Sequence, residues 1–304
     1  MRSNKTPFHG WLVVDKPSGL SSNAVLTKIR HHFGRPKAGF AGTLDPFATG
    51  VLPIAFGEAT KLMDYMVDTV KTYTFTVRWG TQTDTDDKDG VPIKTSDNRP
   101  TLDDIQSALA QFTGIIQQVP PQYSAVKVQG KRACDRVRQQ EEVTLKARSV
   151  EVHDFKVLGH AGDTTDFQVT CGKGTYIRSL ARDLAEFLGT CSHVDVLCRE
   201  SVGIFSRERA ANYNKLLEVK GQIALQEWVH PMAIVLDDIP ALVIGEDAVK
   251  KIRHGQTISY CESLGILPDV NVSIGVLLKD FSQTLVAMST LKEGVLHPNR
   301  VFIY

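Results

Sequence analysis

The chain has 304 residues, of which 42% are hydrophobic, and its 35 basic and 34 acidic side chains give a formal net charge of +1. This length favours one large domain or a main domain with a smaller appendage, and the balanced charge excludes a histone-like tail while leaving local basic surfaces open. Five cysteines without zinc-site spacing, and no apolar run long enough for a signal peptide or a membrane span, predict a soluble cytoplasmic protein.

The first part of the chain alternates strand and helix patterns. The apolar run 10–15 predicts a strand that ends at the Lys16-Pro17 turn. Residues 21–33 place apolar side chains at i, i+4 spacing between a serine cap and Gly34, which predicts a helix. The next expected elements are a buried strand at 51–56 and a short helix at 60–67.

The clearest strand pattern covers residues 71–79. Tyr73, Phe75, Val77 and Trp79 alternate with threonine or arginine, so one face should be aromatic and buried. The acidic segment TDTDDKDG at 83–90 should follow as a loop, and it matches the calcium-binding loop pattern only superficially.

A basic region occupies the middle of the sequence. We expect a helix at 101–118 and then a hairpin that turns at Gly130. Residues 126–148 contain seven basic and three acidic side chains and lie next to Tyr123. This composition suits a nucleic-acid surface and a solvated face equally well.

The last third predicts one more strand and helix of the main domain and a small β-rich domain. A strand at 167–171 should precede a helix at 175–188, with Arg178 and Arg182 directed away from its core face. The residues expected to face the core are Ile177, Leu180, Leu184 and Phe187. After residues 237–240 we expect a helix at 246–253 and strands near 271–279, 284–288 and 300–303.

Asp45 is the leading candidate for chemistry. It lies in the stretch GFAGTLDPFATG (39–50), where Pro46 disfavours helix and Gly42 and Gly50 permit tight backbone paths. A carboxylate in a stiff apolar loop is costly to ionise unless it is paired, and such sites are often functional. The alternative is an ordinary Asp-Pro surface turn.

A partner would decide between these readings of Asp45. Arg178 opens a helix behind a Gly-Lys-Gly turn and could keep the carboxylate ionised, or it could be a surface arginine. Tyr73 could serve a site or only pack in the core. Lys16 could brace the end of its strand or contact a phosphate.

Five stretches in this order resemble the bacterial TruB-type tRNA pseudouridine-55 synthases. They are GWLVVDKPSGLSS, KAGFAGTLDPFATGVLPI, KTYTFTVRWGTQTDTDDKDG, VPPQYSAVKVQGKR and CGKGTYIRSLARDLA. The resemblance covers about residues 10–205, and the tail is similar to the PUA-like domain that follows the catalytic domain in this family.

The resemblance implies a role for each matching residue. Asp45 matches the catalytic aspartate, Tyr73 the tyrosine that stacks on the target base and is implicated in proton removal, and Arg178 the arginine that pairs with the carboxylate. The residues implied to form the rest of the substrate site are Lys16, Phe40, Tyr176 and Leu197. Phe40 departs from the family pattern, because many bacterial members have a histidine there that inserts into the T-loop, and Cys134 replaces a usual tyrosine.

The resemblance also implies a fold and a function. We expect an α+β pseudouridine synthase fold with a central mixed sheet over residues 1–236, an insertion at about 95–150, and a PUA-like RNA-binding domain over 237–304. The expected activity is isomerisation of uridine 55 in the T-stem-loop of tRNA by a cytoplasmic monomer that needs no cofactor, metal or membrane. The alternatives are a non-catalytic RNA-folding module and an Asp-dependent hydrolase of nucleosides or glycosides.

Overall fold

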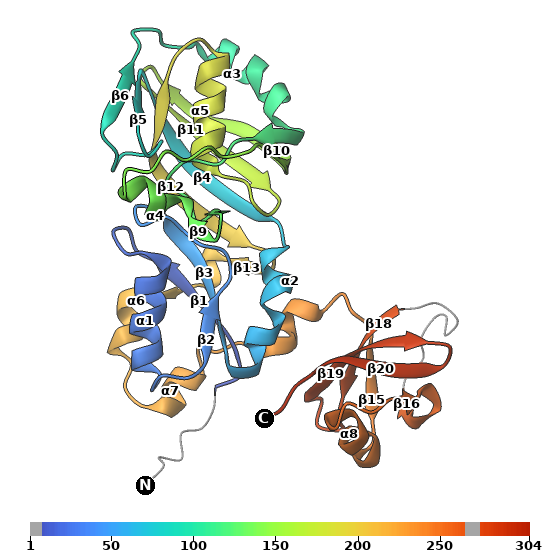
Figure 1. Cartoon of the computed structure of the whole chain (residues 1–304). Coiled ribbons are helices and arrows are strands. Elements are labelled where there is room, and N and C mark those ends of the chain that lie inside the picture. Colours follow the sequence, from blue (N-terminus) through green and yellow to red (C-terminus); the bar gives the residue numbers. More distant parts are fainter. Residues whose placement is uncertain (1–7, 265–273) are drawn as a thin grey trace.

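The computed structural model describes residues 8–264 and 274–304. Within them, a long mixed sheet of ten strands forms the main body, and a six-stranded sheet forms a smaller C-terminal part (Figure 1). Helices α3 and α5 cover one half of the long sheet, and α1 and α6 lie at the other half. No helix of the described residues is long and apolar enough to cross a membrane.

The long sheet runs in the order β14-β1-β3-β12-β4-β11-β10-β7, with β2 paired to β3 and β13 paired to β12. Its strands are β1 (Gly10–Lys16), β2 (Ala38–Phe40), β3 (Thr49–Phe56), β4 (Lys71–Trp79), β7 (Gly114–Gln118), β10 (Arg148–Ala161), β11 (Thr164–Cys171), β12 (Ser192–Val202), β13 (Phe205–Ser206) and β14 (Ala211–Asn212). The α-helices of the main body are α1 (Ser22–His32), α2 (Met63–Val67), α3 (Leu102–Ala108), α4 (Ala133–Arg138), α5 (Ile177–Phe187), α6 (Tyr213–Glu218) and α7 (Gln222–Gln226).

Two hairpins and the C-terminal part complete the fold. The hairpins are β5 (Thr81–Thr83) with β6 (Pro92–Thr95), and β8 (Lys127–Val128) with β9 (Lys131–Arg132). The C-terminal part contains β15 (Ala241–Ile244), α8 (Glu246–Arg253), β16 (Ile258–Ser259), β17 (Ser263–Leu264), β18 (Ile274–Lys279), β19 (Leu285–Lys292) and β20 (Val295–Val301).

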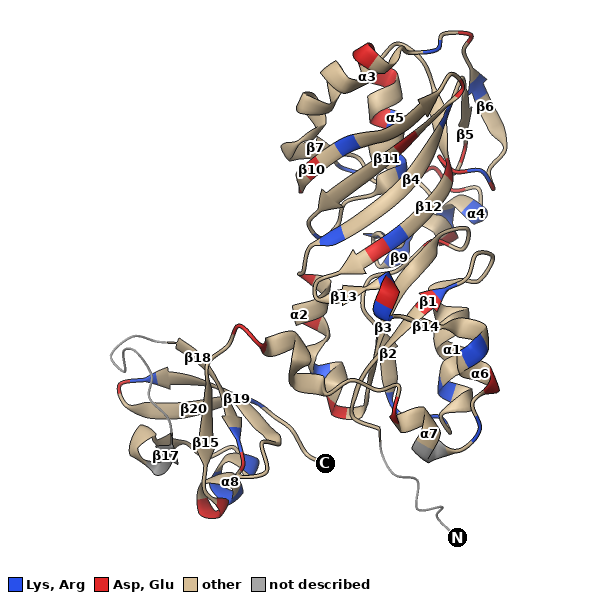
Figure 2. Ribbon diagram, turned by 180° about the vertical axis from the view of Figure 1, so that it is seen from behind, with Lys and Arg blue, Asp and Glu red and all other residues tan. Residues whose placement is uncertain are grey.

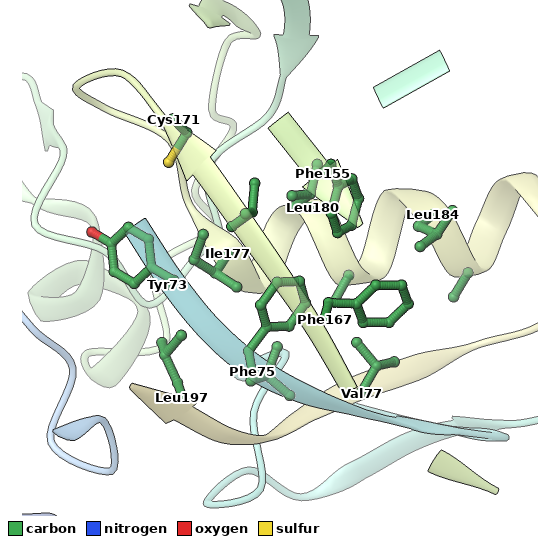
Figure 3. Packing of buried hydrophobic residues seen from close by; sticks show 14 of the residues in the cluster. Tyr73, Phe75, Val77, Phe155, Phe167, Cys171, Ile177, Leu180, Leu184 and Leu197 are labelled. Atoms are coloured by element: carbon green, nitrogen blue, oxygen red, sulfur yellow. The ribbon is translucent and has the colours of Figure 1, made fainter. Parts of the chain in front are cut away.

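Strand β4 confirms the alternating pattern that its sequence predicts. Its odd-numbered side chains from Lys71 to Trp79 are buried, and the last four of them share an apolar cluster with α5 (Figure 3). Tyr73 lies at one end of this cluster, and its hydroxyl points away from the other labelled side chains. The aromatic face therefore forms part of the core, and the Tyr73 hydroxyl lies at the edge of that core.

Helix α1 is also confirmed, and its cap has the expected form. The Ser21 hydroxyl accepts a hydrogen bond from the Ala24 amide at 3.1 Å, which satisfies one of the free amides of the first turn. Val25 and Ile29 bury the apolar face of the helix in a cluster that includes Leu52 of β3.

The two halves of the long sheet meet at a short junction. Strands β12 and β3 pair in parallel through only two residue pairs, Cys198 with Thr49 and Arg199 with Gly50. The loop 41–48, which joins β2 to β3 and carries Asp45, enters β3 at this junction. Ligand sites often form where the course of a sheet changes, and this loop is placed accordingly.

The C-terminal part packs against the main body through a shared apolar cluster. Phe302 is fully buried in a cluster that also contains Trp11 and Leu277. Polar contacts reinforce the junction: the Lys61 ammonium donates to the Val301 carbonyl at 2.7 Å, and the Ile303 amide donates to Glu58 at 3.0 Å.

Three predicted elements of the main body are corrected. The expected helix at 101–118 ends as α3 at Ala108, continues as a 3₁₀ helix to Phe112, and gives way to β7. Gly114 has φ of +90°, which breaks the helix, and Ile115-Ile116 then pair with β10. The helix at 60–67 begins instead as a 3₁₀ helix (Gly57–Leu62) and only then becomes α2. Phe187 was expected to face the core but is 60% exposed; it is the last residue of α5, and its ring meets that of Phe112 edge to face.

The C-terminal strands differ from the predicted ones in length. β18 begins at Ile274, and residues 271–273 of the expected strand lie outside the described residues. β19 extends to Lys292 and β20 starts at Val295, so the two form a tight antiparallel pair around Glu293-Gly294. Both turn residues have positive φ, as a two-residue hairpin turn of this type requires.

Candidate active site

The loop around Asp45 is hydrogen-bonded to the turn that follows β1 and to the start of α1. The buried Ser22 hydroxyl donates to the Leu44 carbonyl at 2.9 Å and accepts from the Leu44 amide at 2.8 Å. The Ser18 hydroxyl donates to the Phe47 carbonyl at 2.9 Å, and the Gly19 amide donates to the Pro46 carbonyl at 2.8 Å. These bonds satisfy the peptide groups on both sides of Asp45 and fix the direction of its side chain.

Arg178 grips the Asp45 carboxylate with two nitrogens. Its Nε lies 2.9 Å from Oδ2, and its Nη2 donates to Oδ1 at 2.9 Å. The arginine side chain is only 3% exposed, whereas that of Asp45 is 31% exposed. The charge-assisted hydrogen bond through Nη2 is strong and directional, and the Nε contact adds an ion pair without hydrogen-bond geometry. The carboxylate stays open to a ligand.

A second carboxylate and two carbonyls hold Arg178 from behind. Nη1 lies 3.3 Å from Asp87 Oδ2 and donates to the Thr85 carbonyl at 2.7 Å, and Nη2 also donates to the Tyr123 carbonyl at 3.0 Å. Burial raises the pKa of Asp87, and hydrogen bonding by Thr85 and the charge of Arg178 oppose that rise. Nη1 and Nη2 are therefore held from several sides, which restricts the movement of the guanidinium away from Asp45.

The next turn of α5 repeats this arrangement. Arg182 Nη1 lies 3.1 Å from Asp86 Oδ2, and Nη2 lies 2.8 Å from Asp183 Oδ1. Burial raises the pKa of Asp86, and Arg182 opposes the rise. The acidic segment that the sequence presents as a loop at 83–90 is thus the docking surface for the two arginines of α5.

Tyr73 lies near the carboxylate, on the buried face of β4. Burial raises the pKa of its phenol, and the neighbouring Arg199 guanidinium is the main opposing influence. Leu197 of β12 belongs to the same apolar cluster, together with Leu44 and Phe47 from the Asp45 loop. The exposed carboxylate, the phenol and these apolar side chains could enclose a planar base.

Lys16 lies beneath the loop and does not face solvent. Its ammonium donates to the carbonyls of Pro17, Leu20 and Pro46 at 2.9, 2.6 and 3.1 Å. Burial lowers its pKa to about 8, and the charge of Asp45 opposes that shift. The contacts favour the bracing role over the phosphate contact.

Tyr176 and Phe40 lie at the margins of the site. Tyr176 precedes α5, and its backbone forms two hydrogen bonds with the buried Gln118 side chain. Phe40 on β2 is half-buried and packs against the apolar cluster around α1, which is separate from the cluster that contains Tyr73. The structure thus brings Asp45, Tyr73, Arg178, Lys16 and Leu197 together and leaves Phe40 on the adjoining surface.

Comparison with known proteins decides the family. A model described as the TruB family pseudouridylate synthase N-terminal domain matches residues 30–177. The protein named tRNA pseudouridine synthase B of Caulobacter sp. (strain K31) is 41% identical over 99% of this chain and 98% of its own length. Its namesake from Gluconacetobacter diazotrophicus is 42% identical over 99% of both chains.

The chain belongs to the TruB family of pseudouridylate synthases. The resemblance inferred from the sequence motifs is therefore confirmed. Solved structures confirm the fold class as well: a chain from an H/ACA RNP bound to a substrate RNA containing 2′-deoxyuridine has a TM-score of 0.72 over 97% of this chain and 86% of that chain, at 22% identity. A chain of a Cbf5-Nop10-Gar1 complex gives 0.72 over 97% and 85%, at 24% identity.

Several residues of this TruB-family site were missed from the sequence. Ser22 was considered only as a helix cap, and Asp87 only as part of an acidic loop. A signal for Asp87 does exist, because two arginines one helical turn apart on α5 need carboxylates if they are buried.

Among residues 8–264 and 274–304, no group of three His, Cys, Asp or Glu side chains is arranged to hold a metal ion.

Proposed function

We propose that this chain is a tRNA pseudouridine synthase that isomerises uridine 55 of the T-loop, with Asp45 as its catalytic carboxylate. The observation that carries the proposal is the pairing of Asp45 with Arg178, which fixes both carboxylate oxygens while leaving the side chain 31% exposed beside Tyr73. The names of the relatives, all tRNA pseudouridine synthase B, supply the substrate class.

The reaction suits these residue types. The N1–C1′ bond breaks and leaves its electron pair on the uracil, the base rotates, and C5 then bonds to C1′. A base takes the proton from C5, and N1 of the product takes up a proton, so the composition is unchanged. Asp45 acts either by attacking C1′ or by taking the C2′ proton so that a glycal forms. Both routes need the detached base to be kept from water, and the apolar cluster of Leu44, Phe47, Tyr73 and Leu197 supports this requirement.

A base within a folded T-loop must leave its stack before it can react. Flipping costs roughly a few kcal/mol, and stacking on an aromatic ring such as Tyr73 offsets part of that cost. We assign proton removal to Tyr73 and the lining of the pocket to Tyr176 and Leu197. Lys16 would brace the Asp45 loop, and Phe40 would contact the displaced T-loop bases. Because phenylalanine has no hydrogen-bonding group, Phe40 would act by stacking alone.

A pocket lined by basic residues supports the proposed binding of RNA. It measures about 590 Å³ and lies at the β8–β9 hairpin and α4. It is lined by Lys127, Gly130, Lys131, Arg132, Asp135, Arg138 and Gln139. Figure 2 shows basic residues on α4 and β9, beside the middle of the long sheet. Phosphate contacts of this kind position a structured RNA without reading its sequence.

The remaining parts of the proposal concern assembly. We assign catalysis to residues 1–236, with RNA contacts in the segment 95–150, and further RNA binding to the PUA-like part at 237–304. The protein would act on the T-stem-loop as a monomer in the cytoplasm, where its tRNA substrate is found.

The proposal is tested with tRNA that carries tritium at C5 of its uridines. Rejoining through C5 expels this hydrogen, so we expect release of one tritium equivalent per tRNA with the base still attached. A hydrolase would release free uracil instead, and an RNA-folding module would release neither. The control is a transcript with cytidine at position 55, which should release no tritium. Release from that transcript would contradict the assignment of position 55.

A further inference from the structure

Arg199 occupies the junction between the two halves of the long sheet. On β12 it pairs with Tyr73 of β4 on one side and with Gly50 of β3 on the other. Its side chain is fully buried within the sheet's central region, at 1% exposure. Burying a guanidinium costs free energy unless its donors are satisfied. The acceptors of Arg199 therefore indicate its structural role.

The Arg199 guanidinium spans both ends of the Asp45 loop. Nε donates to the Val51 carbonyl at 2.8 Å, and Nη2 donates to the Gly42 carbonyl at 2.9 Å. Nη1 lies 3.1 Å from the position that a Cβ of residue 42 would take. A planar fork can hold two acceptors at fixed separation, which a single ammonium cannot do.

Glycine is required on both sides of this contact. Gly42 has φ of +75° and lies against the guanidinium, and Gly50 has φ of +102°. A Cβ at Gly50 would lie 2.2 Å from the Arg199 carbonyl oxygen. The two glycines that frame GTLDPFATG therefore make room for Arg199.

The charge of Arg199 has no carboxylate partner within 4.0 Å among residues 8–264 and 274–304, whereas Arg178, Arg182 and Arg207 all have one. Its charge opposes the effect of burial on the pKa of the Tyr73 phenol, and it also lowers the pKa of Lys16 and Lys71. The cation is thus held by the Asp45 loop, on the strand position that pairs with Tyr73 of β4.

We propose that Arg199 is a positioning residue that holds both ends of the Asp45 loop to β12 and fixes that loop relative to the Tyr73 hydroxyl. The inference rests on the proposed function, because it uses the isomerisation as its readout. Arg199 does not touch substrate, and it acts through the loop and the phenol.

The first test is Arg199→Lys, which keeps the charge but cannot reach both carbonyls. In single-turnover tritium release from C5-labelled tRNA, we expect the rate to fall about 10- to 100-fold, since a displacement of about 1 Å can have this effect. The dissociation constant for tRNA should change less than about 2-fold, because the RNA-facing surface is intact.

The matched control is Arg78→Lys. Arg78 lies on β4, outside the segment to which we assign RNA contacts, and its side chain pairs with Asp195 at 3.1 Å and is 47% exposed. Its rate should equal that of the wild type. An Arg199→Lys rate within 3-fold of the control would overturn the inference.

A second variant covers the case in which Arg199→Lys does not fold. In Gly42→Ala, the added Cβ would crowd the same guanidinium from the side of the loop. This variant should also lower the rate of tritium release and leave the affinity for tRNA unchanged. A cooperative thermal melt above the assay temperature is required of every variant compared. An unchanged rate in a folded Gly42→Ala variant would also contradict the inference.

The link to Tyr73 is tested by a double-mutant cycle. Residues that act as a unit give strongly non-additive losses. On a Tyr73→Phe background, Arg199→Lys should therefore lower the rate by less than about 3-fold. Equal fold-losses on both backgrounds would overturn the link. Absence of release by the wild type would instead contradict the proposed function, so the two failures are distinguishable.

Discussion

At the scale of single residues, one guanidinium organises the site. Arg178 contacts two carboxylates, those of Asp45 and Asp87, and two carbonyls, those of Thr85 and Tyr123. The Asp45 side chain is 31% exposed and can meet a ligand, whereas that of Asp87 is 8% exposed. The other three contacts aim the guanidinium, so they should affect the rate of reaction more than RNA binding.

We predict that Asp87→Asn slows single-turnover isomerisation by roughly 10- to 100-fold, because Arg178 loses one charged partner and its hold on Asp45 loosens. The affinity for tRNA should stay within about 2-fold. Asp89→Asn is the control, since Asp89 is exposed in the same loop. An Asp87→Asn rate equal to that of Asp89→Asn would show that Asp87 does not position Arg178.

Lys71 gives a prediction for pH. It is buried, its ammonium donates to the carbonyls of Val67 and Thr69, and burial lowers its pKa to about 8. Between about pH 8 and pH 10.5 the folded protein therefore binds fewer protons at Lys71 than the unfolded chain. The stability contributed by Lys71 must rise with pH over this window.

The measurement compares wild type with Lys71→Met by denaturant unfolding at several pH values. The stability of the wild type relative to the variant should increase from pH 7.5 to pH 10. The exposed Lys156 serves as control, and Lys156→Met should show no such trend. A difference for Lys71→Met that is constant or shrinks with pH would contradict the assignment.

At the scale of elements, the Asp45 loop depends on close backbone contact with β12. Gly50 has positive φ, and the Arg199 backbone lies where its Cβ would be. We predict that Gly50→Ala lowers the free energy of unfolding by about 3 kcal/mol, from strain and a backbone clash together.

The control for Gly50→Ala is Gly255→Ala. Gly255 also has positive φ, at +75°, but no atom of the described residues lies within 4 Å of its Cβ position. It should cost only the left-handed backbone strain of about 1–2 kcal/mol. Chemical denaturation of both variants measures the difference, and equal losses would show that the contact with β12 carries no energy.

Much of the fold could be predicted from local patterns. The alternation in β4 and the serine cap of α1 depend on neighbours in sequence, and both are confirmed. The helix expected at 101–118 was wrong because Gly114 and the pairing of Ile115-Ile116 with β10 override the apolar spacing. Strand pairing of this kind depends on residues more than thirty positions away.

The residues of the site also divide into those that the local sequence predicts and those that it does not. Asp45 stands out locally because of its glycines and proline, and Arg178 could be proposed as its partner. The two α5 arginines call for carboxylates if they are buried, but the sequence does not say that Asp87 is the one that meets Arg178. The contribution of Arg199 could not be predicted, since it acts through contacts that exist only after the loop and β12 have come together. Burial of a charge is a tertiary property, and the composition of a segment does not reveal it.

At the scale of the whole molecule, the C-terminal part is joined to the main body by apolar packing. The chain's last residues return to the main body, where Phe302 is buried and Lys61 lies over its ring at 5.9 Å. The orientation of the C-terminal part is then fixed by a core rather than by a flexible linker (Figure 1).

We predict that Phe302→Ala lowers the free energy of unfolding by about 3–5 kcal/mol, because it leaves a cavity in the shared cluster. Ile303→Ala is the control, since Ile303 is 61% exposed and should change stability by less than about 0.5 kcal/mol. Calorimetry on the full chain tests both variants. A Phe302→Ala loss as small as that of the control would mean that the two parts do not share a core.

The central claim is that Asp45 performs the chemistry, and Asp45→Asn tests it most directly. The asparagine keeps the size of the side chain and one oxygen for Arg178, so the fold and RNA binding should persist. With C5-tritiated tRNA under single-turnover conditions, we expect tritium release to fall by at least about 10⁴-fold while the tRNA dissociation constant changes less than about 3-fold. Release by Asp45→Asn at a rate near that of the wild type would contradict the account.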